Sequence, residues 1–179
     1  MCGSRKIANV HNRKWQCADC GFDLYNNVAA AVGVVIADGK GNILFEKRAK
    51  EPRKGFLALP GGFVDPDESV EEAAVRECRE ETGVEPASVS YLCSFPNTYE
   101  YKNIVYKTCD FFFTADLPPD VADIDALIQK LHGEESEVLG FASVGIHSEE
   151  DIAKAPLAFV SAEKTLQVWL KNLHNRSIK

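Results

Sequence analysis

Three glutamates, Glu77, Glu80 and Glu81, stand close together near the middle of the chain. We expect them on a helix that begins at Ser69, where a capping-box pattern is present, and ends near Gly83, a residue typical of helix C-termini. At about 100° per residue, all three acids fall on the same side as the apolar residues of this helix. Carboxylates turned inward in this way are costly unless a cation neutralises them.

The acids also stand in the last turns of the expected helix, where the helix dipole disfavours negative charge. The same projection turns Arg76 and Arg79 to the opposite side, and Glu77 and Glu81 repel each other at a spacing of four residues. A hard divalent cation with oxygen ligands, such as magnesium, would relieve both the unfavourable interaction with the helix dipole and the repulsion between Glu77 and Glu81. It would also bind phosphate oxygens. The alternative is a solvated acidic helix face, which is the usual role of glutamate-rich runs.

The residues around this helix resemble the signature of the Nudix hydrolases. Every glycine and polar position of that signature is filled. Gly62 comes first, Glu68 follows after five further residues, and residues 76–84 follow after seven more. Cys78 stands where the family usually has an aliphatic residue, and a buried thiol is a small hydrophobe. The resemblance implies an α/β/α sandwich with a mixed sheet. It also implies hydrolysis of a nucleoside diphosphate linked to another moiety, with magnesium or manganese as cofactor.

The resemblance further implies roles for individual residues. The positions that match the family's metal ligands are three acids and one backbone carbonyl: Glu77, Glu80, Glu81 and Gly61. Arg76 and Glu68 match residues that hold the helix and its preceding loop in place. A carboxylate takes the proton from the attacking water, either Glu81 or an acid from a late loop. Glu137 is the preferred late-loop acid because it directly precedes an apolar run, and Glu135 is the second choice; a solvated loop is the alternative.

Basic and aromatic residues on either side of the signature are candidates for holding the substrate. Solvated surface is the usual role of such charges, and packing is the usual role of tyrosine. On an acidic protein, however, a basic run beside a metal site can hold phosphates, and aromatic rings in a loop can stack on a base. The candidates are Arg48, Arg53, Phe56, Tyr99 and Tyr101.

ADP-ribose, or a similar nucleoside diphosphate sugar, is the leading substrate. Residues 94–99 stand where the NADH pyrophosphatases have a longer motif that contains tryptophan, which this segment lacks. NADH and diadenosine polyphosphates remain alternatives. A non-catalytic module that senses nucleotide sugars, a zinc-ribbon nucleic-acid binder and an isoprenoid diphosphate isomerase are further alternatives. The complete set of signature acids argues against the sensing module. The lack of a suitable catalytic cysteine argues against the isomerase.

The first 27 residues carry three cysteines and differ in composition from residues 28–179, the expected hydrolase domain. Cys17 and Cys20 form a C-x-x-C knuckle, and Cys2 resembles the end of another knuckle whose first cysteine would precede Met1. We therefore expect a truncated zinc ribbon, with His11 as an alternative ligand. A redox dithiol is the other interpretation, but no strand–helix pattern of the thioredoxin kind surrounds the pair. The ribbon resembles the structural appendage of the NADH pyrophosphatase branch.

Composition limits the classes of function. With 179 residues and 45% hydrophobic content, one domain with a substantial core is expected. The formal charge of −7 and the pI near 5.1 argue against nucleic acid as a partner. The resemblance implies a small nucleotide as the substrate. No apolar run approaches a membrane span, and scattered cysteines favour a reducing cytoplasm. The resemblance is compatible with a homodimer.

The remaining elements follow from hydrophobic patterning. Residues 28–36 and 43–48 are expected to form a hairpin around a glycine-containing turn. A second pair of strands, 89–95 and 104–115, would be joined by a loop that holds Tyr99 and Tyr101. Further expected elements are short strands at 56–59 and 139–142 and helices at 121–131 and 162–173.

Overall fold

The computed structural model describes residues 2–86, 88–132 and 136–176. Two three-stranded sheets stand at its centre, with the strand orders β4-β8-β7 and β6-β5-β9. Their strands are β4 (Ala29–Ile36), β5 (Asn42–Arg48), β6 (Leu57–Ala58), β7 (Ser90–Tyr101), β8 (Ile104–Ala115) and β9 (Val138–Gly145). Strand β4 runs parallel to β8, whereas β7 runs antiparallel to β8, so the expected mixed sheet is confirmed.

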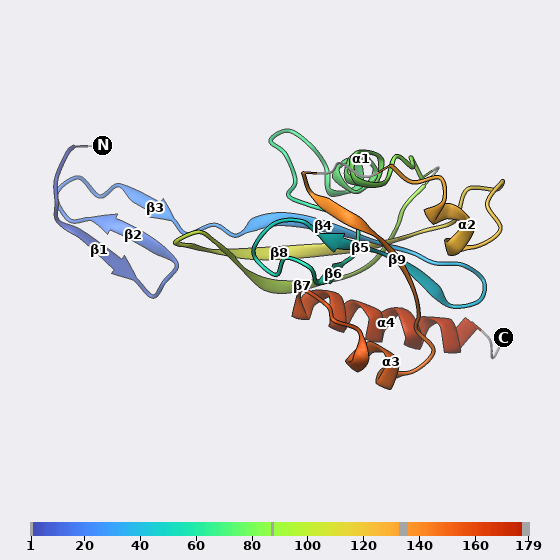
Figure 1. The fold of residues 1–179 in the computed structure, drawn as a ribbon. Helices are drawn as coiled ribbons and strands as arrows, with labels where there is room; N and C mark the ends of the chain where they lie inside the picture. Colours follow the sequence, from blue (N-terminus) through green and yellow to red (C-terminus); the bar gives the residue numbers. More distant parts are fainter. Residues whose placement is uncertain (1, 87, 133–135, 177–179) are drawn as a thin grey trace.

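Helices cover both faces of these strands (Figure 1). On one side lie α1 (Val70–Thr82) and α2 (Ile124–Ile128), and on the other lie α3 (Glu149–Lys154) and α4 (Val160–Arg176). Each side has its own apolar core. Leu44 packs with Cys78 in the core beneath α1 and α2, whereas Phe45 packs with Leu166 in the core beneath α4. This arrangement confirms the α/β/α sandwich.

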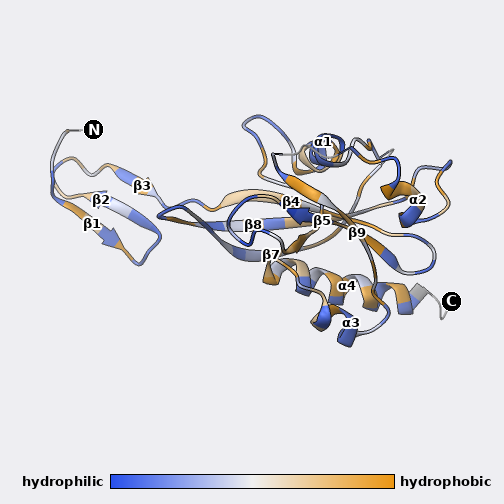
Figure 2. Ribbon diagram, viewed as in Figure 1, coloured by the Kyte–Doolittle hydropathy of each residue, from blue (hydrophilic) through white to orange (hydrophobic). Residues whose placement is uncertain are grey.

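Helix α4 is amphipathic, with apolar and polar residues alternating around it (Figure 2). Leu166, Trp169 and Leu170 are buried against the sheet, as their helical spacing predicts. Leu173 was expected on the same face, but it remains 39% exposed near the end of the helix. Most of the expected apolar face of this helix therefore packs on the sheet of its own chain.

The hairpin expected for residues 28–36 and 43–48 is wrong. The turn itself forms, because the Asp38 carboxylate accepts hydrogen bonds from the backbone amides of Lys40 (2.8 Å) and Asn42 (2.9 Å). Only one bridge, Ala37 with Ile43, joins the two strands at this turn. Beyond it β4 pairs with β8, and β5 pairs with β6 and β9, so the strands diverge into different sheets.

Several other boundaries differ from the sequence-based expectations. Strand β7 continues to Tyr101, so Tyr99 lies on a strand and not in a loop. Helix α2 is restricted to five residues within the expected range 121–131, and β9 extends the strand expected at 139–142. Helix α3 was not expected; it begins after Ser148, whose hydroxyl accepts a hydrogen bond from the Asp151 amide.

The N-terminal residues form a separate antiparallel sheet of β1 (Ile7–Val10), β2 (Lys14–Cys17) and β3 (Asp23–Tyr25). Figure 1 shows this small sheet projecting from one end of the α/β body. Within the described residues, none of the helices combines the length and the apolar character needed to cross a membrane.

Candidate active site

Helix α1 is positioned by local sequence at both ends. The Ser69 hydroxyl accepts a hydrogen bond from the Glu72 amide and the Glu72 carboxylate accepts one from the Ser69 amide, so the predicted capping box is confirmed. Gly83 ends the helix in the left-handed conformation (φ 74°) and donates its amide to the Arg79 carbonyl. Between these caps, Ala73 and other small residues are fully buried against β4.

The three signature acids differ in burial. Glu81 is only 7% exposed, and the side chain of Glu77 is 13% exposed. The side chain of Glu80 is 50% exposed, so its expected inward orientation is only partly realised. Glu80 lies at the edge of the helix face, beside solvent, whereas the other two acids line a cavity.

Arg76 does not point away from the core as expected, because its side chain is only 19% exposed. The guanidinium donates to both carboxylate oxygens of Glu68, at 2.8 and 2.9 Å, and to the Phe63 carbonyl at 3.0 Å. The same guanidinium reaches Glu77 at 2.8 Å and Glu80 at 3.1 Å. These contacts connect the loop before α1 to the helix, and they raise the Arg76 pKa, chiefly through Glu68.

The glycine turn before α1 places a backbone amide on Glu81. Gly61 has φ 149°, and a Cβ at this position would overlap the Val32 carbonyl oxygen and lie 2.8 Å from the Cα of Gly33. In this conformation the Gly61 amide donates to Glu81 Oε2 at 2.7 Å. A Cβ on Gly62 would overlap the Glu77 carboxylate, so both glycines permit the close approach of the turn to the acids.

A further acid, Glu46, was not singled out from the sequence. It lies on β5, lines the cavity with Glu77 and Glu81, and is only 3% exposed. Among the described residues, its Oε2 atom has no hydrogen-bond donor. Its place two residues after the buried Leu44 gave a usable signal, because alternate residues of a strand face the same side.

Burial of these acids changes their protonation. It raises the pKa of Glu81 to about 7, although the Gly61 amide acts in the opposite direction. It also raises the pKa of Glu46 well above its ordinary value, with the negative charge of Glu81 adding to the effect. The pKa of Glu77 is raised by burial and lowered by Arg76, with a net increase. These carboxylates are clustered, their raised pKa values favour the protonated form, and the Oε2 atom of Glu46 has no hydrogen-bond donor within the described residues. Such a group of oxygen ligands fits a divalent cation.

These acids share a cavity of about 440 Å³ with aromatic rings. Phe63 and Tyr99 meet edge to face with their centroids 5.5 Å apart, and Tyr99 lies 5.9 Å from Phe159. The Arg48 guanidinium lies 5.1 Å from the centre of the Phe159 ring, and its Nε donates to the Pro52 carbonyl. The cavity therefore joins acidic, cationic and aromatic groups.

The other substrate-binding candidates lie elsewhere. Arg53 and Phe56 contact each other at 5.7 Å and are exposed, and neither is among the described residues that line the cavity. Tyr101 ends β7, and its side chain lies outside the described part of the chain. Of the four candidates whose side chains the structure describes, Arg48 and Tyr99 are the two that line the cavity.

The late-loop acid Glu137 lines the cavity directly before β9. Its Oε1 atom lies 2.6 Å from Lys50 Nζ, and its carbonyl accepts a hydrogen bond from the Ala49 amide. Its negative charge raises the pKa values of Glu77 and Glu81. Glu135, the second choice from the sequence, lies outside the described residues.

A buried polar cluster completes the cavity wall and was also missed. Asp110, on β8, is 6% exposed and accepts side-chain hydrogen bonds from Asn97 (2.8 Å), Ser161 (2.7 Å) and Thr108 (2.6 Å). The sequence signal is one acid directly before a run of three phenylalanines in this strand. Its donors come from β7, β8 and the first turn of α4, which no local pattern connects.

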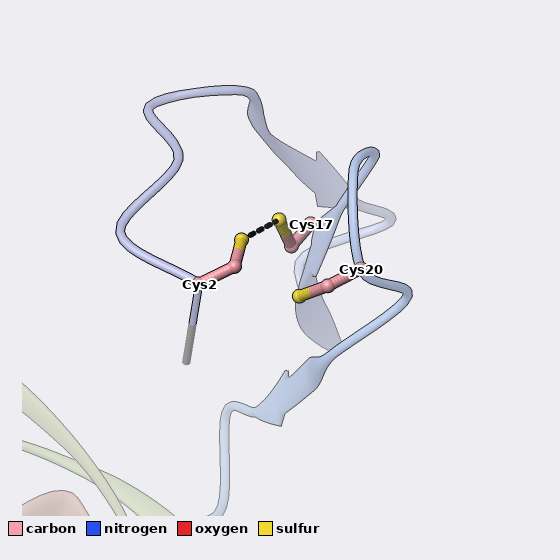
Figure 3. Close-up of side chains that lie close together, drawn as sticks. All are labelled: Cys2, Cys17 and Cys20. Carbon is pink, nitrogen blue, oxygen red and sulfur yellow. Dashed lines mark hydrogen bonds between the residues drawn. The ribbon is translucent and has the colours of Figure 1, made fainter.

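The three N-terminal cysteines come together at the end of the small sheet (Figure 3). The Sγ atoms of Cys2, Cys17 and Cys20 lie within 4.8 Å of one another, a spacing that could hold a metal ion. Hydrogen bonds from the backbone amides of Cys20 and Asp19 lower the pKa of Cys17 to about 7, which favours the thiolate. His11 is not part of this cluster.

Comparison with known proteins gives the chain a family. Residues 28–166 match the NUDIX domain. The NAD-capped RNA hydrolase NudC of Pseudomonas aeruginosa is 39% identical over 95 residues, which are 52% of this chain and 33% of that protein. The ADP-ribose pyrophosphatase of Methanocaldococcus jannaschii is 51% identical over 72 residues, which are 40% of this chain and 41% of that protein. The matches therefore span less than half of each curated relative.

Solved structures show the same fold. The MutT protein from Methanosarcina mazei superimposes with a TM-score of 0.62 at 23% identity, over 83% of this chain and 98% of that one. The NUDIX domain of Shewanella oneidensis NrtR complexed with ADP ribose gives 0.63 at 22% identity, over 83% and 90%. At this level of identity the likeness concerns the fold alone.

Proposed function

The chain belongs to the Nudix family, and we propose that it hydrolyses the pyrophosphate bond of a nucleoside diphosphate linked to another moiety. ADP-ribose, or a similar nucleoside diphosphate sugar, is the proposed substrate. The observation that carries this proposal is the single cavity in which Glu77 and Glu81 lie together with Arg48 and Tyr99. Such a cavity offers a cation site for a pyrophosphate and rings for a nucleoside.

A magnesium or manganese ion fits the acidic part of this cavity. Glu77, Glu80 and Glu81, with the carbonyl of Gly61, would hold it. When bound, the ion supplies positive charge to the phosphate oxygens and makes water easier to deprotonate. Arg76 and Glu68 position these ligands, because the guanidinium joins Glu68 to two of the acids.

A carboxylate must accept the proton of the attacking water. Glu137 is our proposed general base, since it lines the cavity and its Lys50 contact holds the carboxylate in place. Glu81 is the alternative, because a pKa of about 7 suits proton transfer near neutral pH. Glu81 also has its Oε2 occupied by the Gly61 amide, which favours Glu137.

The remaining cavity residues would hold the substrate. Arg48 provides a charge for the phosphate not bound by metal, and Phe159 restricts the guanidinium by stacking on it. Tyr99 provides a ring for the base. Asp110 orients Asn97, whose amide lies in the cavity wall.

NAD-containing compounds are a second candidate substrate class, since several relatives are named NAD-capped RNA hydrolases. The net charge of −7 disfavours a long nucleic-acid contact, so NADH would be the simpler substrate of this class. Diadenosine polyphosphates remain a third candidate. A module that only senses a nucleotide sugar is the non-enzymatic alternative.

We further propose that residues 28–179 form the hydrolase domain and that residues 1–27 form a zinc-ribbon-like segment. Three clustered thiols support zinc as the metal of this segment, because thiolates are preferred zinc ligands. A cytoplasmic protein that acts on a small nucleotide, alone or as a homodimer, is consistent with these features. The free thiols among the described cysteines agree with a reducing compartment.

The test is product release from a panel of ADP-ribose, NADH, NAD-capped RNA, diadenosine polyphosphates and nucleoside triphosphates, with magnesium or manganese. A double variant, Glu80→Gln with Glu81→Gln, is expected to abolish turnover. Glu150→Gln, an exposed acid on α3, is the matched control and should retain it. Tight binding of one compound without turnover by the intact protein would instead support the sensing module.

A further inference from the structure

We infer that Glu46 of β5 is an additional carboxylate ligand of the divalent cation, beyond the acids that the helix α1 contributes. This inference rests on the proposed function, since it concerns the same metal site. It assigns a metal-binding role to a strand residue that lies outside the signature. The ligand class is a hard divalent cation, magnesium or manganese, with oxygen coordination.

The first argument is the state of the Glu46 side chain. It is 3% exposed and faces the cavity, yet its Oε2 atom meets no hydrogen-bond donor in the part of the chain that the structure describes. Buried polar atoms in folded proteins almost always have a partner, and an unpartnered carboxylate is among the most costly exceptions. Within the described ranges, the Oε2 atom of this cavity-lining residue therefore lacks a partner, which a cation would provide.

The second argument is the distribution of positive charge around the acids. Arg76 binds Glu68, Glu77 and Glu80, but among the described residues it forms no ion pair within 4.0 Å with Glu46 or Glu81. Arg48 attracts Glu46 only at longer range, because no ion pair within 4.0 Å joins them among the described residues. Glu46 and Glu81 thus face each other without a cationic side chain between them.

The third argument is the rigidity of the position. Glu46 pairs with Phe141 of β9 on one side of β5 and with Ala58 of β6 on the other. A ligand on a strand that is hydrogen-bonded on both sides is held more accurately than one on a loop. Glu46 and Glu81 also come from different elements, so together they fix the cation relative to both the sheet and α1.

A purely structural role makes a different prediction. If the Glu46–Glu81 pair served only to pack the core by sharing a proton, replacing Glu46 with glutamine would change metal binding little. If Glu46 is a ligand, Glu46→Gln removes a charge that the metal needs. The amide can still donate to Glu81, so the metal-free protein should be as stable as wild type or more so.

The experiment measures Mn²⁺ binding to the full chain by electron paramagnetic resonance of the free ion, with Mg²⁺ as competitor. Both ions favour oxygen over thiolate ligands, so the cysteine cluster does not interfere. Glu46→Gln is expected to weaken binding by at least about tenfold while the metal-free melting temperature stays equal or rises. Glu150→Gln is the control with wild-type affinity, and Glu77→Gln tests the proposed site itself.

Wild-type Mn²⁺ affinity in Glu46→Gln, with weakened binding in Glu77→Gln, overturns the inference and leaves the proposed function standing. Unchanged affinity in both variants overturns the metal site as a whole. If Glu46→Gln does not fold, Glu46→Asp replaces it, because it keeps the charge but withdraws the carboxylate by one methylene. The aspartate variant should bind about tenfold more weakly and admit an extra water to Mn²⁺, seen as higher water-proton relaxivity; an unchanged affinity and relaxivity overturn the inference.

Discussion

The contacts of Arg76 allow a quantitative prediction about what holds the acidic site together. Its side chain is 19% exposed and donates to Glu68 through two hydrogen bonds, while also reaching Glu77. Substitution Arg76→Met keeps most of the apolar stem and removes every one of these donors. The Glu68 and Glu77 side chains, which are 14% and 13% exposed, are then left without their cation.

The magnitude follows from the burial of the pair. Removing one partner of a buried ion pair costs about 3–5 kcal/mol, and the residual exposure here places the expected loss near the lower value, about 3 kcal/mol. For a domain of this size, each kcal/mol lowers the melting temperature by about 2–4 °C, so a decrease of roughly 6–12 °C is expected. Urea titration in magnesium-free buffer measures the free energy directly.

A double-mutant cycle separates the coupling energy of the Arg76–Glu68 pair from a general loss of stability in each variant. Combining Arg76→Met with Glu68→Gln should show a coupling energy of at least about 1.5 kcal/mol, because the two hydrogen bonds are charge-assisted and partly buried. The control cycle uses the exposed pair Lys154 and Glu150, 70% and 75% exposed, where coupling below about 0.5 kcal/mol is expected. Equal coupling in both cycles would refute the claim that Arg76 organises this site.

Four further outcomes are expected. Gly61→Ala should lower the free energy of unfolding by about 1–3 kcal/mol in urea titration, because φ 149° and the Val32 carbonyl exclude a Cβ. In the metal-free protein, the free energy of unfolding of wild type relative to Glu81→Gln should fall by a few kcal/mol as the pH rises from about 4.5 to 7. In this pH range the folded state holds a proton on Glu81 that the unfolded chain has lost. A pH-independent difference between the two proteins would contradict this. Tyr99→Ala should raise KM about tenfold with a smaller change in kcat, since stacking on a base contributes about 1–3 kcal/mol. Cys17→Ser should remove any stoichiometric zinc detected by elemental analysis, while zinc-free wild-type protein would contradict the ribbon.

Local sequence patterns predicted the parts of the site that are determined locally. The limits of α1 follow from Ser69 and Gly83, both of which act on backbone groups within one turn. The burial of Glu77 and Glu81 follows from their angular position beside Cys78. The direction of Arg76 does not follow from such a projection, because a long side chain can curl back toward partners that lie beside its own helix.

Other parts depend on contacts between distant segments and were missed for that reason. Strand β4 pairs with β8, so that Ala29 lies opposite Thr108, and a short turn after β4 gave a misleading indication of a hairpin. Asp110 reaches Ser161 from another element, which a pattern along one strand cannot show. Glu46 is an intermediate case, since the strand period indicates its burial but not its neighbour Glu81.

The cavity also separates the proposed chemistry from the proposed choice of substrate. The acidic residues are coupled, because Arg76 joins the helix to its loop and the Gly61 amide binds Glu81, so a change at one disturbs the others. Tyr99 lies on β7 and Phe159 lies directly before α4, and the two residues meet through their rings. Replacing either ring would therefore alter the substrate without displacing the acids. The relatives that this chain matches are named for different substrates, so the substrate panel, rather than the signature, must decide the substrate.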